Sequence, residues 1–242
     1  AIGSSLAWGA VLRGMGHCVT TLVPNRYPAF LDWMDGISDI VIAKEQPEAA
    51  MEAINSAELV FVMDLNKIDR LDAMSEPLMA SSAPRILIDH HLMPPDDYTL
   101  QFSFPELCST AFVTYKIIEA VAGVEAITTP MAENLYAGIM TDTGNFSYNS
   151  NRPQIYTIIS ALVAAGANKD AIYDAVIGFV VFHILSDFHL LLPIPSQSSG
   201  SGKSSYCAAI CSALFFCPSG SSLTSGDRSA SFMSKWDFSH QM

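Results

Sequence analysis

Three short segments of this sequence place carboxylate or imidazole side chains immediately after or within apolar runs. Asp64 closes FVMD at 61–64, Asp89, His90 and His91 close ILIDHH at 86–91, and Asp142 lies in GIMTDTGNF at 138–146. Taken singly, an Asp after a strand is often a helix cap, and a loop His is often only solvated. Taken together, these residue types are the oxygen and nitrogen ligands that divalent metal ions bind in proteins.

The elements around these residues predict an α/β fold with a mostly parallel sheet flanked by helices. The run 59–63 is continuously apolar, as is typical of a strand buried on both faces, and 86–88 is a second such run. Helices are predicted over 3–12, 47–57, 67–79, 110–121, from Pro130 to Asp142, 153–165 and 170–176, and a strand over 17–23. Because ligands bind at the carboxyl ends of parallel strands, Asp64 and Asp89–His91 are the leading site candidates.

The three motifs, in this order and at these separations, resemble the DHH phosphoesterase family. The similarity extends from about residue 1 to about residue 176. Further segments, VPNRYP at 23–28, CSTAFVTYKII at 108–118 and TDTGNFSY at 141–148, resemble its oligoribonuclease and phosphoadenosine-phosphate phosphatase branch.

The resemblance implies a centre of two Mn²⁺ ions. By this mapping Asp64 bridges both ions, and His90 and Asp142 complete the shell of the second ion. His91 matches the residue that faces the scissile phosphate, and Asp89 matches a partner that orients an imidazole. His91 and Asp89 are therefore the predicted catalytic pair, Asp64, His90 and Asp142 the predicted metal ligands, and the substrate-binding residues are left unassigned.

The same resemblance predicts that parts of the family pattern lie outside this chain. The first motif, a His followed by a D-x-D pair, would precede Ala1, and no segment after residue 176 matches the smaller substrate domain. We therefore expect weak manganese binding and little turnover from these 242 residues alone. The absence of a first strand would also leave backbone groups of the strand 59–63 unpaired.

The composition changes near residue 178, which predicts two regions. Residues 1–176 form the DHH domain, and 177–242 form a Ser-rich tail that we interpret as out-of-frame or foreign sequence rather than a native domain. Within the tail, GSGKSS at 200–205 lacks the first Gly and the preceding strand of a phosphate-binding loop. The apolar stretch 177–195 carries His183, Asp187 and His189, so a membrane span is not expected.

The net charge limits the classes of partner that the sequence favours, and the cysteines indicate its cellular location. A net charge of −12 argues against a surface that binds duplex DNA through its phosphates, but leaves open a short anionic substrate held by metal ions. Five cysteines without a C-x-x-C spacing, and the absence of an export signal at the start of the sequence, favour a reducing, cytoplasmic location. Short RNA or nucleotides are the expected partners, a membrane is not, and a homodimer is left open.

The predicted function is manganese-dependent hydrolysis of short oligoribonucleotides and of 3′-phosphoadenosine 5′-phosphate. An inorganic pyrophosphatase or exopolyphosphatase of the same family is the first alternative, because these enzymes share the site. The second alternative is a non-catalytic nucleotide-binding remnant of the fold.

Overall fold

The computed structural model describes residues 1–65, 67–94, 96–178 and 212–217. The segment 200–205 and nearly all of the apolar stretch 177–195 lie outside these residues, so the expectations about them stay untested. Among the described residues, no helix is both long and apolar enough to cross a bilayer.

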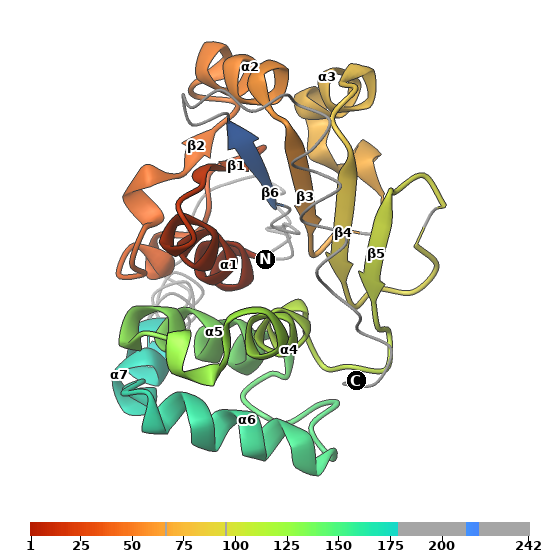
Figure 1. Cartoon of the computed structure of the whole chain (residues 1–242). Helices are drawn as coiled ribbons and strands as arrows, with labels where there is room; N and C mark the ends of the chain where they lie inside the picture. The colour runs from red at the N-terminus through yellow and green to blue at the C-terminus, as the bar shows by residue number, and fades with distance from the viewer. Residues whose placement is uncertain (66, 95, 179–211, 218–242) are drawn as a thin grey trace, which may run out of the picture.

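A six-stranded sheet forms the centre of the molecule, in the order β2-β1-β6-β3-β4-β5 (Figure 1). The strands are β1 (Cys18–Val23), β2 (Val41–Ile42), β3 (Leu59–Met63), β4 (Arg85–Asp89), β5 (Leu100–Ser103) and β6 (Ser212–Cys217). The pairs β1–β2, β3–β4 and β4–β5 are parallel, which confirms the predicted mostly parallel sheet.

The strand β6 pairs antiparallel with β1 on one side and with β3 on the other. Every residue of β3 has a partner in β6, and Val60 to Met63 also have partners in β4. The expectation that β3 would carry unpaired backbone groups is therefore wrong. A segment of the tail, which shows no period in its sequence, supplies the missing hydrogen bonds, while the division of the chain at residue 176 stays a prediction.

Helices cover both faces of the sheet because the strands are apolar on both faces. Leu59, Phe61 and Met63 of β3 pack into one core, and Val60 and Val62 pack into the other, as the two-residue period of a strand requires. The first core contains the packed faces of α1 (Ile2–Gly14), α4 (Thr110–Ala122) and α5 (Thr129–Asp142). The second contains those of α2 (Pro47–Ser56) and α3 (Ser75–Ala80).

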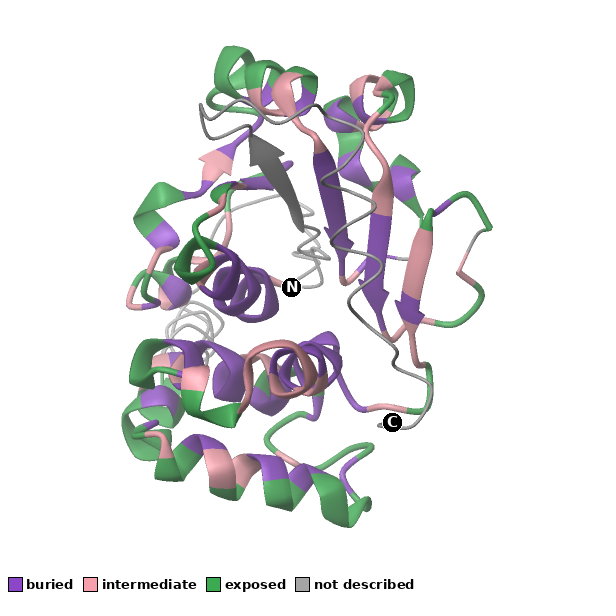
Figure 2. Ribbon diagram, viewed as in Figure 1, coloured by how far each residue is buried: buried purple, intermediate pink, exposed green. Residues whose placement is uncertain are grey.

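The outer elements complete the fold. α6 (Pro153–Ala164) packs on α4 and α5, and α7 (Lys169–Tyr173) continues into a π-helical turn, Asp174–Gly178. Short 3-10 helices are Ala29–Leu31, Ile37–Asp39, Ile68–Met74 and Val124–Ala126. Figure 2 shows that β3 and β4 are buried along most of their length, whereas α2, α3 and α6 expose their outer faces.

Most predicted elements are confirmed with small shifts of their ends. The single helix expected over 67–79 is instead a 3-10 helix, Ile68–Met74, followed by α3, because Asp72 adopts a non-helical conformation with φ 50° and ψ −126°. The short strands β2 and β5 were not predicted.

Candidate metal centre

The candidate centre lies at the carboxyl ends of β3 and β4, where the two strands deliver their polar residues side by side. Asp64 directly follows β3, and Asp89 ends β4 with His90 and His91 next in the chain. One ligand atom from each of Asp64, His90 and His91 lies within 4.8 Å of the others. The predicted convergence of the two strand ends is therefore observed.

The backbone at Asp64 turns sharply into the site. Its φ of 58° lies in the left-handed region, which costs Asp and Asn less than other side chains because their short polar groups bond locally. The backbone N–H of Asp64 still donates to the carbonyl oxygen of Ile88 at 3.0 Å. The turn thus ends β3 while the last ladder bond to β4 holds the carboxylate in place.

Three groups surround the Asp64 carboxylate. The Thr110 hydroxyl donates to Oδ1 at 2.6 Å, and the amino group of Ala1 lies 2.7 Å from Oδ2. The Nε2 atom of His90 is 3.6 Å from Oδ1. Burial by itself would raise the pKa of Asp64, but the Ala1 amino group, the Thr110 hydroxyl and His90 outweigh burial and lower it to about 2. The carboxylate is therefore ionised throughout the neutral range.

The two imidazoles are each oriented through their Nδ1 atoms. Nδ1 of His90 lies 3.3 Å from the carbonyl oxygen of Leu107, and Nδ1 of His91 lies 2.7 Å from Oδ1 of Asp89. Each contact leaves Nε2 as the nitrogen available to a metal ion or a phosphate. The hydrogen bond from Asp89 also raises the pKa of His91, against the effect of its partial burial.

Asp89 is fully buried, and only one of its carboxylate oxygens has a partner in the described part of the chain. Oδ1 holds His91, whereas Oδ2 has no hydrogen bond there. A buried carboxylate that serves one imidazole matches the orienting role predicted for Asp89. That role, like the roles of the other site residues, stays a prediction.

Asp142 ends α5 and is not among the three residues whose ligand atoms converge. The charges of those three residues nevertheless act on its carboxyl group. Loss of hydration and, to a smaller extent, the charge of Asp64 raise the pKa of Asp142, whereas the Ala1 amino group, His90 and His91 lower it, and the net result is a pKa of about 6. A carboxylate at a helix C-terminus faces the negative end of the helix dipole. The position therefore favours a cation partner for Asp142.

Replacing Asp142 with asparagine is expected to stabilise the metal-free protein at neutral pH. Since the pKa of Asp142 is raised to about 6 in the folded state, its contribution is most favourable below pH 3.8 and is lost as the pH rises through 6. Removing the charge should gain about 1 kcal/mol at about pH 8, a rise in Tm of about 2–4 °C, and nothing at about pH 4. Thermal unfolding in EDTA at both pH values tests this expectation, and an equal gain at both would contradict it.

The start of α4 contributes two residues to the site with separate tasks. Ser109 is the N-cap of α4, and its hydroxyl accepts the backbone N–H of Phe112 at 3.0 Å. Thr110 makes the bond to Asp64 described above. The structure therefore assigns the helix cap to Ser109. The carbonyl of Leu107 was not predicted, because a backbone group carries no signal in the sequence.

Comparison with known proteins supports the family. The model of the DHH family, N-terminal domain, matches residues 1–139, a stretch that contains Asp64 and Asp89–His91 and stops just before Asp142. A bifunctional oligoribonuclease and PAP phosphatase, NrnA, from Thermus thermophilus is 30% identical over 175 residues, which are 72% of this chain and 49% of that protein. The uncharacterized protein MG371 homolog of Mycoplasma pneumoniae is 29% identical over 126 residues, 52% of this chain and 37% of its own length.

Among solved structures, an exopolyphosphatase-related protein from Bacteroides fragilis superposes with a TM-score of 0.71 and 41% sequence identity, covering 73% of this chain and 52% of that one. The chain thus spans about half the length, or less, of the relatives it matches. Three observations indicate the same family: the match to the family model, the carboxylates and imidazoles at the strand ends, and the likeness to this solved structure. The chain belongs to the DHH family, whose members are metal-dependent phosphoesterases.

Proposed function

We propose that this protein hydrolyses phosphoesters with the help of Mn²⁺ held by Asp64, His90 and Asp142, and that its substrates are short oligoribonucleotides and 3′-phosphoadenosine 5′-phosphate. The observation that carries the proposal is the convergence of Asp64, His90 and His91 within 4.8 Å at one edge of the sheet. The substrate class rests on the likeness to the Thermus thermophilus NrnA.

The donor atoms of this centre suit a divalent metal ion. An ionised carboxylate at Asp64 and an imidazole nitrogen at His90 are both ligands that manganese accepts. The buried Oδ2 of Asp89 has no hydrogen-bond partner among the described residues, and Oδ1 of the same carboxyl group orients His91. Bound divalent ions would supply charge neutralisation for a phosphate and activation of water.

The residues of the chain would then position the substrate. His91 presents Nε2 while Asp89 holds Nδ1, and its raised pKa favours a protonated ring that donates to a phosphate oxygen. The N-terminal end of α4, next to Asp64, adds backbone N–H groups and the positive end of the helix dipole. His91 and the N-terminal end of α4 would therefore both bind a phosphate of the substrate at this edge of the sheet.

A second candidate function, hydrolysis of pyrophosphate or polyphosphate, is favoured by one observation. The Bacteroides fragilis protein described as exopolyphosphatase-related is 41% identical to this chain. The metal centre would serve either substrate, because both present a phosphate to the ions. The choice therefore depends on what lies around the centre rather than on the centre itself.

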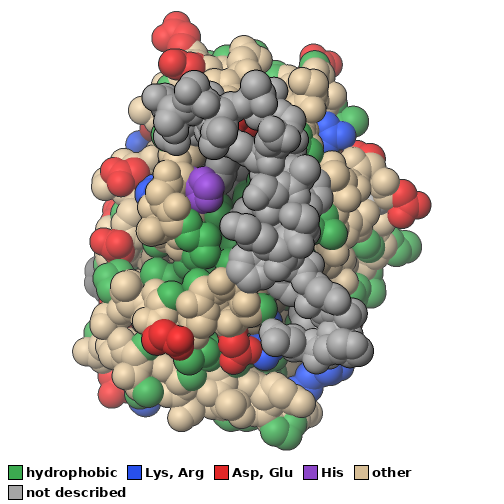
Figure 3. All heavy atoms as spheres, in the orientation of Figure 1, with side chains coloured by type: hydrophobic (Ala, Val, Ile, Leu, Met, Phe, Trp, Pro, Cys, Tyr) green, Lys and Arg blue, Asp and Glu red, His purple; other side chains and the backbone are tan. Residues whose placement is uncertain are grey.

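The proposal also includes the class of binding partner and the cellular location that the sequence predicts. On the face drawn in Figure 3, the acidic side chains of the described residues are scattered, and the few Lys and Arg side chains do not gather into a patch. This distribution supports a short substrate over duplex DNA. We propose a cytoplasmic protein that binds no membrane, and we leave open whether it forms a homodimer.

The substrate proposal predicts a specific pattern of hydrolysis. The complete product of this gene, supplied with Mn²⁺, should release mononucleotides from a diadenylate and phosphate from 3′-phosphoadenosine 5′-phosphate, as followed by chromatography. It should act at least about tenfold more slowly on pyrophosphate and polyphosphate, a difference of about 1.4 kcal/mol in transition-state binding. Asp69→Asn removes an exposed carboxylate that is not among the convergent ligands, so it is the control and should not change the pattern.

Faster hydrolysis of pyrophosphate or polyphosphate would establish the second candidate. No hydrolysis of any of the four substrates would contradict both and favour a non-catalytic nucleotide-binding protein. Parallel calorimetry with Mn²⁺ on the 242-residue chain would show whether the centre binds metal independently of turnover.

A further inference from the structure

Two buried side-chain oxygens without partners belong to directly opposed residues at the ends of β4 and β5. Asp89 ends β4 and is paired in register with Ser103, which ends β5. Asp89 is fully buried, and its Oδ2 atom has no hydrogen-bond partner among the described residues. The Oγ atom of Ser103 is also buried and has no partner in the same part of the chain. Because buried polar groups in folded proteins are nearly always hydrogen-bonded, a partner is expected for both atoms.

The side chain of Asp89 lies on the face of the sheet that α2 and α3 cover. Successive side chains of a strand point to opposite faces. Ile86 and Ile88 of β4 pack into the core that contains α1, α4 and α5, whereas Leu87 packs into the core that contains α2 and α3. Asp89 comes two residues after Leu87 and therefore shares its face.

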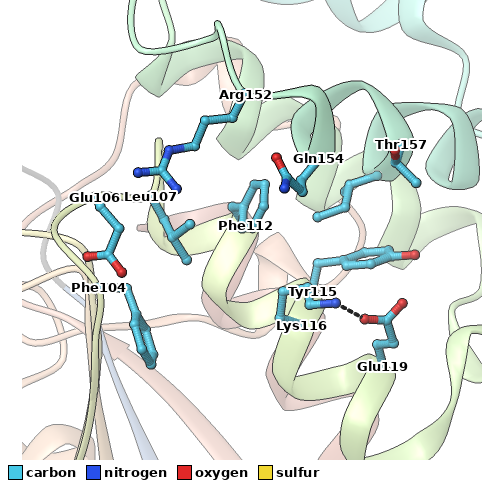
Figure 4. Close-up of a pocket in the computed structure, with 11 residues that line it drawn as sticks. Phe104, Glu106, Leu107, Phe112, Tyr115, Lys116, Glu119, Arg152, Gln154 and Thr157 are labelled. Atoms are coloured by element: carbon cyan, nitrogen blue, oxygen red, sulfur yellow. Dashed lines mark hydrogen bonds and ion pairs between the residues drawn. The ribbon is translucent and has the colours of Figure 1, made fainter. Parts of the chain in front are cut away.

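The side chain of Ser103 lies on this same face. Phe102 packs into the core of α1, α4 and α5, and Phe104 packs against that core and lines a cavity of about 520 Å³ between α4 and α6 (Figure 4). Ser103, between these two rings in the chain, points to the other face. The backbone N–H of Phe104 donates to the carbonyl oxygen of Asp89 at 3.1 Å, which fixes the register. Neighbouring strands are about 4.8 Å apart, so the two side chains can share one water molecule.

The unpartnered oxygen of Asp89 belongs to the carboxylate that orients His91. Oδ1 of Asp89 lies 2.7 Å from Nδ1 of His91. A carboxylate that is held through only one oxygen can turn about its last carbon–carbon bond, and the imidazole it holds then loses its fixed orientation. A hydrogen-bond donor at Oδ2 would remove this freedom, as the outer partners of residues around metal centres commonly do.

We propose that Ser103 is a positioning residue, which holds Asp89 and through it His91 by way of one buried water bound to both Oγ and Oδ2. Buried waters with two to four polar partners are a regular part of protein structures. The water donates to Oδ2, and the Ser103 hydroxyl can either donate to the water or accept from it. The inference rests on the proposed function and deepens it, because His91 is the residue predicted to face the scissile phosphate.

Tyr98 offers a second buried hydroxyl on this side of the sheet. Its ring packs into the core of α2 and α3, and its hydroxyl has no partner within the described ranges. Burial raises the pKa of Tyr98, and the charges of Asp97 and, more weakly, Asp89 add to the rise. Tyr98 precedes β5, however, whereas Ser103 lies directly opposite Asp89. The register therefore favours Ser103, and Tyr98→Phe separates the two hydroxyls by experiment.

Ser103→Thr and Ser103→Val test the inference without metal and without turnover, because threonine and valine have the same shape and only threonine keeps a hydroxyl. The measurement is the tautomer of His91 in the 242-residue chain in EDTA, from the ¹³C chemical shift of its Cδ2 atom. A pH of about 9 is well above the ordinary pKa of histidine. The Nδ1–H form should dominate in the unmodified chain and in Ser103→Thr. In Ser103→Val its ratio to the Nε2–H form should fall about tenfold, the size expected for one hydrogen bond to a charged group.

Thr21→Val is the matched control. It replaces a buried hydroxyl that has no partner among the described residues, and β6 and β3 separate its strand, β1, from β4. This variant should leave the tautomer of His91 unchanged. A crystal structure of the unmodified chain is the second measurement and needs no variant to fold. It should show one ordered water within hydrogen-bond distance of both Oγ of Ser103 and Oδ2 of Asp89.

Three results would each overturn the role of Ser103. They are the same tautomer ratio in Ser103→Val as in Ser103→Thr, a shift of this ratio by Tyr98→Phe in place of Ser103→Val, and a crystal structure in which no water contacts both oxygens. Hydrolysis of 3′-phosphoadenosine 5′-phosphate by the complete gene product, together with any of these results, would leave the proposed function standing. A tautomer shift in Ser103→Val without hydrolysis of any substrate would do the reverse.

Discussion

Replacing Asp64 with asparagine is expected to weaken Mn²⁺ binding by more than about a hundredfold, as measured by calorimetry on the purified chain. Asp64 is the ionised group at the centre of the site, with a pKa lowered to about 2, and it lies next to His90 and Thr110. Asparagine keeps the size of the side chain and tolerates the left-handed backbone, φ 58°, that Asp64 adopts. The substitution should therefore remove the charge and leave the fold intact.

Asp69→Asn is the matched control, because Asp69 is exposed and lies in the 3-10 helix that follows the same strand. Its Mn²⁺ affinity should equal that of the unmodified chain. If Asp64→Asn bound Mn²⁺ as well as this control does, Asp64 would not be a ligand and the centre would have to be assigned to other residues.

Replacing Gly3 with alanine is expected to destabilise the fold by about 3 kcal/mol, which corresponds to a fall in Tm of about 6–12 °C. A Cβ at Gly3 would overlap the backbone carbonyl oxygen of Asn134, because α1 and α5 approach each other closely at this point. A backbone group cannot move aside as the end of a flexible side chain can, so the two helices would have to separate. Thermal and urea unfolding measure the loss.

Gly14→Ala is the control for Gly3→Ala. Gly14 is the last residue of the same helix, and a Cβ there meets no atom within 4 Å. Alanine in that position should stabilise the protein by as much as about 1 kcal/mol, since it lowers the conformational entropy of the unfolded chain and has a higher helix propensity than glycine. A result in which Gly3→Ala melts at the same temperature as the unmodified chain would mean that α1 and α5 are not packed as described.

The parts of the fold that could be predicted from sequence are those with a strong local signal. The run 59–63 has no polar residue and was assigned its observed ends, and the helix from Thr129 to Asp142 begins with a Pro at its first turn. The position of the candidate site followed from a topological rule, because the ends of β3 and β4 lie side by side in a parallel sheet. The same rule predicts that Asp64 and His90 converge.

The parts that could not be predicted depend on contacts between distant segments. The pairing of β6 with β1 and β3 joins residues near 215 to residues near 20 and 60, and no period in the tail indicates it. β2 has only two residues, too few for a pattern. The contacts of Leu107 with His90 and of Thr110 with Asp64 are tertiary, so neither appears in the local sequence.

The most direct test of the metal centre is the position of bound Mn²⁺ in crystals of this chain, located by anomalous scattering at the manganese absorption edge. The account predicts a peak in contact with the Asp64 carboxylate and Nε2 of His90, at the carboxyl ends of β3 and β4. A peak elsewhere on the molecule, with none at Asp64 and His90 under conditions in which calorimetry shows binding, would contradict it.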